Sequence, residues 1–159
     1  MDLGIYLVTA PNPDIRALLE ELNATLAANY DPDQRHGLAL AQLFQPSIRF
    51  FIAHLDQVPV ACGGVALCEG YAEVKRMFVR PAARGRGVAK CLLARLADEA
   101  RAAGLPVLRL ETGVHQAEAI GLYEQFGFSR CAAFGPYAGM LANAIALSVF
   151  FELPLSAAA

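Results

Sequence analysis

Three strand-type runs follow one another in the middle of the chain, and they constrain the fold more than any other feature of the sequence. Residues 48–54 (IRFFIAH) and 58–67 (VPVACGGVAL) are rich in β-branched and aromatic side chains, and only LDQ separates them. A third run, residues 71–79, follows the turn residues Glu69 and Gly70. Strands spaced this closely most simply form an antiparallel meander. We therefore expect a sheet built around these three strands.

Helical spacing of apolar residues is found on both sides of this meander. A first helix is predicted from about Asp14, with apolar positions at Ile15, Leu18, Leu19, Leu22 and Leu26. A second, shorter helix is predicted from Asp33 to Phe44, where Pro46 would stop it. After the meander, another helix is predicted before Gly104, because Val88, Leu92, Leu96 and Ala100 recur every four residues.

The remaining segments complete an alternating order of elements. A short strand is predicted at residues 5–8, a buried strand at 107–112, a helix at 116–126, and two strands at 128–133 and 145–153. The resulting order is β-α-α-β-β-β-α-β-α-β-β. It predicts an α/β fold with a mixed, mostly antiparallel central sheet and helices on both faces. At 159 residues the chain is the size of one domain, so residues 1–159 are taken as a single domain.

Composition excludes several classes of protein. The formal net charge is −2 and the pI is near 5.9, which argues against a nucleic-acid binder or a membrane-surface binder. No apolar window is long enough for a membrane span and no signal-peptide pattern is present, so a cytoplasmic protein is expected. The four cysteines form no CxxC pair, and no metal site is predicted.

One short basic stretch stands out against this acidic background. RPAARGRGVAK, residues 80–90, holds three arginines and a lysine between a predicted strand and a predicted helix. Free backbone N–H groups at a helix start, with glycines that allow close approach, favour an anion and above all a phosphate. A solvated, arginine-rich turn is the alternative. The spacing of the glycines fits neither a Walker loop nor a dinucleotide fingerprint.

Three segments resemble one known family. RGRGVA, residues 84–89, fits the pyrophosphate-loop pattern Arg/Gln-x-x-Gly-x-Gly/Ala of the GNAT N-acetyltransferases, AEVKRMFVRP resembles the family's fourth strand, and AIGLYEQFGF resembles its last helix. The resemblance covers residues 58–130 firmly. It implies that acetyl-CoA is the cofactor. The backbone of Met77, Phe78 and Val79 would pair with the pantetheine arm of acetyl-CoA, beside a β-bulge. The acetyl group would lie where the fourth and fifth strands splay apart. The resemblance also implies that the pyrophosphate is held by Arg84, Gly85, Arg86, Gly87, Val88, Ala89 and Lys90, and that Gln116 contacts the cofactor.

The same resemblance suggests which residues carry the chemistry. Glu73 occupies the position of a base glutamate, although a strand carboxylate paired with Lys75 or Arg76 is the alternative. Tyr123 matches the family's proton donor to the CoA sulfur. Glu111 is a second candidate base or a binder of a cationic substrate, and His115 is a further candidate base. Tyr137 and Asn143 are expected in a loop over the acceptor site.

The implied activity is transfer of an acetyl group to a primary amine of a small molecule, or of a protein or peptide, by direct attack in a ternary complex. A non-catalytic module that binds acyl-CoA is the alternative. The sequence identifies neither the acceptor nor the length of the acyl chain. An exposed edge strand makes a homodimer possible.

Overall fold

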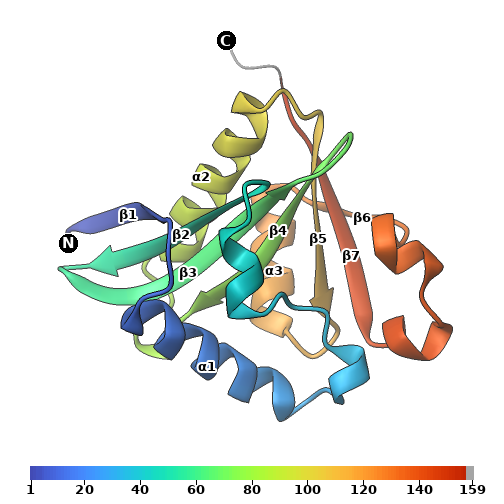
Figure 1. Ribbon diagram of the computed structural model, residues 1–159, viewed down its shortest axis with the longest axis horizontal. Coiled ribbons are helices and arrows are strands. Elements are labelled where there is room, and N and C mark those ends of the chain that lie inside the picture. The colour runs from blue at the N-terminus through green and yellow to red at the C-terminus, as the bar shows by residue number, and fades with distance from the viewer. Residues whose placement is uncertain (157–159) are drawn as a thin grey trace.

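A computed structural model, which describes residues 1–156, shows one seven-stranded sheet (Figure 1). The strand order is β1-β2-β3-β4-β5-β7-β6. The strands are β1 (Leu3–Val8), β2 (Ile48–Leu55), β3 (Val58–Leu67), β4 (Ala72–Val79), β5 (Val107–Gly113), β6 (Ser129–Arg130) and β7 (Ser148–Pro154). All neighbouring strands are antiparallel except β4 and β5, which are parallel. The mixed, mostly antiparallel α/β sheet expected from the sequence is confirmed.

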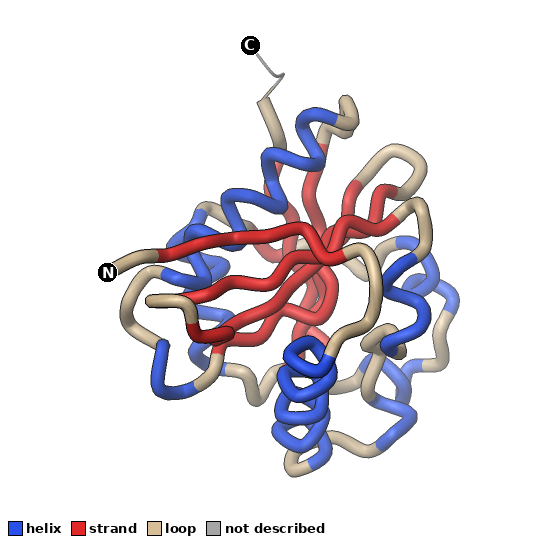
Figure 2. Tube along the Cα trace, turned by 60° about the vertical axis from the view of Figure 1, so that its left-hand side comes forward, coloured by secondary structure: helices blue, strands red, loops and turns tan. Residues whose placement is uncertain are grey.

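Helices cover the two faces of the sheet, and the alternation along β2 decides which side chains meet which helix (Figure 2). The helices are α1 (Pro13–Ala27), α2 (Val88–Ala102) and α3 (Ala117–Phe126). Phe51 and Ala53 pack in the apolar cluster that contains the buried residues of α2 and α3. Phe50 and Ile52 pack in a separate cluster with the buried face of α1. This alternation is what a strand buried on both sides requires.

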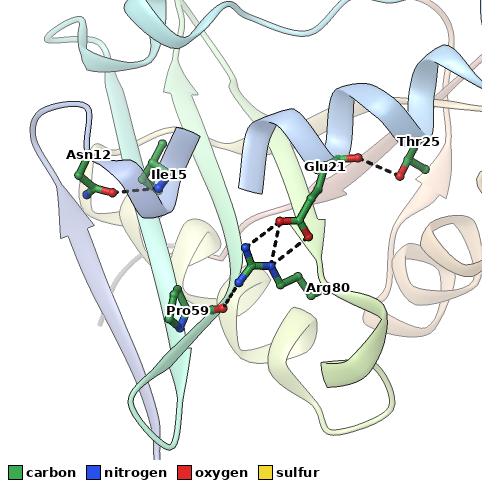
Figure 3. Close-up of polar contacts among 6 residues, drawn as sticks. All are labelled: Asn12, Ile15, Glu21, Thr25, Pro59 and Arg80. Carbon is green, nitrogen blue, oxygen red and sulfur yellow. Dashed lines mark hydrogen bonds and ion pairs between the residues drawn. The ribbon is translucent and has the colours of Figure 1, made fainter. Parts of the chain in front are cut away.

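Polar contacts fix α1 against the sheet (Figure 3). The side chain of Asn12 caps the helix by accepting a hydrogen bond from the Ile15 N–H at 2.9 Å. In the middle of the helix, both carboxylate oxygens of Glu21 accept hydrogen bonds from Arg80, which follows β4, at 2.7–3.1 Å. Arg80 also donates to the Pro59 carbonyl at 2.8 Å. Together these contacts tie α1 to the end of β4, where the arginine-glycine loop begins.

The second helix predicted for residues 33–44 is wrong. The structure has two 3-10 helices there, Pro32–Gln34 and Leu40–Phe44, joined by an extended segment. Gly37 lies in that segment, and a side chain on it would collide with the guanidinium of Arg76. The segment is therefore shaped by contacts with the sheet, with Leu38 and Leu40 packed against the α1 cluster, rather than by helical propensity.

The end of the chain departs from its prediction in a smaller way. The predicted strand 128–133 shortens to Ser129–Arg130, and two 3-10 helices, Gly135–Gly139 and Ala142–Ile145, precede β7. Tyr137 of the first of these and Phe134, which precedes it, pack with Phe150 of β7. Within residues 1–156, none of the helices combines the length and apolarity needed to cross a membrane.

Candidate active site

The parallel strands β4 and β5 separate soon after they meet. Only Ala72↔Leu108 and Glu73↔Arg109 are paired between them in the part of the chain that the structure describes. Figure 1 shows the two strands diverging from this point. Within the described residues, the edge of β4 beyond Glu73 therefore has no neighbouring strand on the β5 side, which is the splay expected from the family resemblance. Backbone groups along that edge are available to a ligand.

A β-bulge changes the direction of the side chains in β4. Gly64 pairs with Lys75 and Cys62 pairs with Phe78, so Gly63 lies opposite both Arg76 and Met77. Arg76 has a φ of 54°, in the left-handed region that side chains rarely adopt. Val74 and Met77 both pack toward α2, which leaves the consecutive residues Lys75 and Arg76 on the opposite face. The bulge expected from the family resemblance is present, and it places two cations side by side.

A pocket of about 120 Å³ opens at this split. Strands β4 and β5, the C-terminal half of α1 and the helix α3 all contribute to it. Its lining includes Glu73, Lys75, Arg76, Met77, Glu111, Gln116, Tyr123 and Tyr137, together with residues 34–37. Every catalytic and acceptor-site residue predicted from the sequence, except His115 and Asn143, therefore meets in one place.

Glu73 lies at the centre of a buried polar group. Its side chain is only 5% exposed, and its Oε2 accepts a hydrogen bond from the Tyr137 hydroxyl at 2.6 Å. The ammonium of Lys75 lies 2.8 Å from the same oxygen and 3.1 Å from the Tyr137 hydroxyl. Burial and the neighbouring Glu73 carboxylate raise the pKa of Tyr137, so this phenol stays protonated. Two donors thus occupy Oε2 and leave Oε1 of Glu73 for another partner.

Glu111 is the second carboxylate of the pocket. It lies near the end of β5 and accepts a hydrogen bond from the Ser148 hydroxyl at 2.7 Å. Burial raises the pKa of Glu111, and the bond from Ser148 opposes that shift. Glu73 adds to the rise through like-charge repulsion. The pocket therefore offers an incoming ammonium group two carboxylates, of which Glu73 is already paired with Lys75.

Tyr123 closes the pocket from α3. The side chain is buried between Phe128 and Phe151, and burial raises its pKa. Its hydroxyl makes no hydrogen bond within residues 1–156, although the residue lines the pocket. Gln116, the residue before α3, lines the same pocket. This environment keeps the phenol neutral and able to donate.

His115 and Asn143 lie outside the pocket. His115 is exposed, and its ring packs at a tilt against Tyr30, whose hydroxyl accepts a hydrogen bond from the backbone N–H of His115 at 2.9 Å. Asn143 is exposed and donates to Asp33 at 3.3 Å. The contacts of His115 give it a role in positioning the turn before α3, and nothing in its surroundings favours it as a base.

The arginine-glycine loop has the backbone shape of an anion site. Gly85 and Gly87 both have a φ of 79°, and a Cβ on either would meet no atom within 4 Å. Gly87 precedes the first residue of α2, so the first N–H groups of that helix have no partner inside it. The side chains of Arg86 and Lys90 are exposed nearby. Open space, free N–H groups and the positive end of a helix dipole suit a phosphate group.

Arg84 contributes to this loop in a second way. Its guanidinium donates to the Val79 carbonyl at 3.0 Å and lies 3.4 Å from Glu118 of α3. The side chain therefore joins the end of β4, the loop and α3 across the mouth of the split. Its pair with Glu118 is exposed, so an incoming anion can compete for the guanidinium.

Sequence reasoning missed several residues of this site. Lys75 was considered only as a charge partner for Glu73, and Ser148, Tyr30, Arg35 and His36 received no role. The Lys-Arg pair after Glu73 was the one available signal, because two adjacent cations in an otherwise apolar strand indicate a polar surface at that point. The others reach the pocket from segments far away in sequence.

The chain is similar to known proteins in both sequence and fold. The sequence profile of the acetyltransferase (GNAT) family matches residues 15–128. An IAA acetyltransferase of Azospirillum brasilense is 47% identical over 140 residues, covering 87% of this chain and 88% of that protein. A solved structure from Klebsiella pneumoniae, assigned as an acyl-CoA N-acyltransferase, has a TM-score of 0.78 at 33% identity and covers 97% of this chain and 98% of that one. The structure of yncA from Salmonella typhimurium with its cofactor acetyl-CoA shares the fold, with a TM-score of 0.70 at 20% identity over 100% of this chain and 97% of that one.

Proposed function

The chain belongs to the acetyltransferase (GNAT) family and is an N-acetyltransferase, and from this premise we propose that it acetylates the primary amine of a small molecule with acetyl-CoA in a ternary complex. The observation that carries the proposal is the meeting of two carboxylates, Glu73 and Glu111, with the phenol of Tyr123 in one pocket at the open edge of β4. A pocket of this kind can hold an ammonium group, remove its proton and protonate a leaving group.

The residues of the chain fit acetyl-CoA at two places. The loop Arg84–Lys90 offers free N–H groups and open space for the pyrophosphate. The unpaired edge of β4 at Met77, Phe78 and Val79 offers backbone groups to the extended pantetheine arm, and Gln116 lies beside it in the pocket. When bound, acetyl-CoA supplies the thioester that a neutral amine attacks directly.

Glu73 is the proposed base. Its Oε2 is taken by Lys75 and Tyr137, so these two side chains fix the carboxylate and leave Oε1 to accept a proton from the ammonium group. Glu111 lies in the same pocket and attracts the cationic amine before its deprotonation. If Glu111 were the base instead, Glu111→Gln rather than Glu73→Gln would cause the larger loss of kcat.

Tyr123 is the proposed proton donor. Burial raises the pKa of its phenol, so the hydroxyl is protonated at neutral pH, and it is free of hydrogen bonds to the rest of residues 1–156. A phenol in this state can protonate a departing thiolate. Its position between Phe128 and Phe151 holds the ring in place.

The test measures release of free CoA from acetyl-CoA in the presence of a panel of amines, with IAA added because a relative carries that name. We expect at least one amine to stimulate release. Tyr123→Phe should lower kcat while calorimetry shows unchanged acetyl-CoA affinity, and the exposed Tyr6→Phe is the matched control. Binding of acetyl-CoA without release for any compound would instead favour a non-catalytic acyl-CoA-binding module.

A further inference from the structure

A second cavity adjoins the active-site pocket, and we propose that it binds a carboxylate group of the acceptor through Arg35 and Arg76. The acceptor class is then an amino acid or another amine that carries a carboxylate. This inference rests on the proposed function, because it names the substrate class of that same site.

The second cavity is about 490 Å³ and lies between α1 and the segment 35–40. It shares Leu26, Arg35, Gly37 and Arg76 with the pocket that contains Glu73 and Glu111. A single ligand can therefore extend from the carboxylates into the second cavity. Its two ends would meet opposite charges.

The balance of charge differs between the two cavities. Arg35 and Arg76 line both, but only the active-site pocket also holds Lys75 and the carboxylates of Glu73 and Glu111, which can bind an ammonium group. The second cavity is lined by Arg16, Arg35 and Arg76 against a single carboxylate, Glu20. An amine whose other end is anionic is complementary to this arrangement.

Arg35 and Arg76 lack the carboxylate partner that several other arginines of this chain have. Five arginines lie within 4.0 Å of a carboxylate: Arg80, Arg84, Arg95, Arg101 and Arg109. Within residues 1–156, Arg35 and Arg76 form no such ion pair. The Nε atom of each is buried without a hydrogen-bond partner, as is that of Arg101 and Arg109, but Arg101 and Arg109 each have a carboxylate nearby. Among the described residues, the guanidinium of Arg76 has one side-chain partner, the amide oxygen of Asn23. A ligand carboxylate would satisfy these donors, since guanidinium groups bind carboxylates with two parallel hydrogen bonds.

The backbone supports the position of Arg76. The bulge holds Arg76 at a φ of 54°, which is unfavourable for any residue other than glycine. The bulge also turns the guanidinium of Arg76 toward α1 and away from the face that α2 covers. Gly37 then passes over it so closely that a Cβ would collide with Nη1. The bulge and the bond to Asn23 therefore place one cation between the two cavities.

The test compares acceptors in matched pairs. Each amino acid is assayed beside its carboxamide, and each ω-amino acid beside the alkylamine of equal length. We expect the carboxylate member to have a kcat/KM about tenfold higher or more, the equivalent of one charge-assisted hydrogen bond. Arg35→Gln and Arg76→Gln should remove that preference by raising KM for the carboxylate member alone. Arg49→Gln, on β2 outside both cavities, is the control.

The outcomes separate the two claims. Turnover with equal kcat/KM for both members of every pair, or equal losses for both in the arginine variants, would overturn the carboxylate site and leave the acetyltransferase assignment intact. A stronger preference for aminoalkyl phosphates than for amino acids would overturn the carboxylate assignment. If no amine were acetylated, the proposed function would fail. Calorimetric titration with the amino acids would then decide the site, and equal binding by wild type and Arg35→Gln would refute it.

Discussion

The buried contact among Glu73, Lys75 and Tyr137 makes a quantitative prediction. The side chains of Lys75 and Glu73 are 14% and 5% exposed, and 2.8 Å separates their charged atoms. Lys75→Met keeps the length and apolar stem of the side chain but removes its charge. Glu73 would then remain buried with the Tyr137 hydroxyl as its one strong partner. Removing one partner of a buried ion pair lowers the free energy of unfolding by about 3–5 kcal/mol. Because the 2.6 Å hydrogen bond from Tyr137 remains, we expect a loss at the lower end, about 3 kcal/mol.

Urea unfolding at pH 7, followed by circular dichroism, measures this cost. Glu73→Gln should also destabilise the protein, because the buried ammonium of Lys75 loses its counterion. The double variant Glu73→Gln/Lys75→Met should recover about 2 kcal/mol relative to the sum of the two single variants, since no unpaired charge remains buried. Lys90→Met, at an exposed position, is the matched control.

Two results would refute this reasoning. A loss below about 1 kcal/mol for Lys75→Met would mean that the pair behaves like an exposed salt bridge. Additive losses in the double variant would mean that the two side chains do not depend on each other. Either result would also weaken the role of Lys75 in fixing the proposed base.

Three further predictions concern other parts of the fold. Arg80→Gln should lower the free energy of unfolding by about 1 kcal/mol at pH 7, a modest value because Glu21 is 42% exposed. The hydrogen bond from Arg80 lowers the pKa of Glu21. The stabilisation from this pair is therefore complete above the unfolded-state pKa of the carboxyl group and is lost as the pH falls through the lower folded-state pKa. Unfolding curves taken toward acid pH should show a narrowing difference in stability between the variant and the wild type. Gly87→Ala forces a side chain into the left-handed region at a cost of about 1–2 kcal/mol in folding stability. Calorimetry should show weaker binding of acetyl-CoA, and unchanged binding would argue against this loop as the pyrophosphate site. Leu92→Ala should cost about 3 kcal/mol in thermal unfolding, because Leu92 is fully buried between α2 and the sheet, and a cost under about 1 kcal/mol would contradict that packing.

Much of the fold could be predicted from hydrophobic periodicity. The meander and the helices α1 and α2 have long patterns of one period, and each element occurs where its pattern predicts it. The helix predicted for residues 33–44 was wrong because their few leucines fit more than one conformation. In the structure Leu38 and Leu40 pack against the α1 cluster and Gly37 lies against the guanidinium of Arg76, and the contact with Arg76 joins segments far apart in the sequence.

The active site could be predicted only in part. The family resemblance pointed to Glu73 and Tyr123, and the structure brings both to one pocket with Glu111. The partner of Glu73 could not be predicted, because Tyr137 lies 64 residues away in the sequence. The bulge was expected from the resemblance, but its left-handed residue is Arg76, where propensity alone would suggest glycine.

The bulge at Arg76 makes β4 unusual in how it would respond to the loss of one residue. Removing one residue from a strand normally turns every later side chain to the wrong face. In β4, Arg76 is the extra residue opposite Gly63, while Val74 and Met77 already face the same side. Deleting Arg76 would restore regular alternation and leave every other side chain of the strand on its present face. A deletion of this one residue would therefore remove both the bulge and one cation of the proposed carboxylate site, while the inward and outward pattern of β4 is kept.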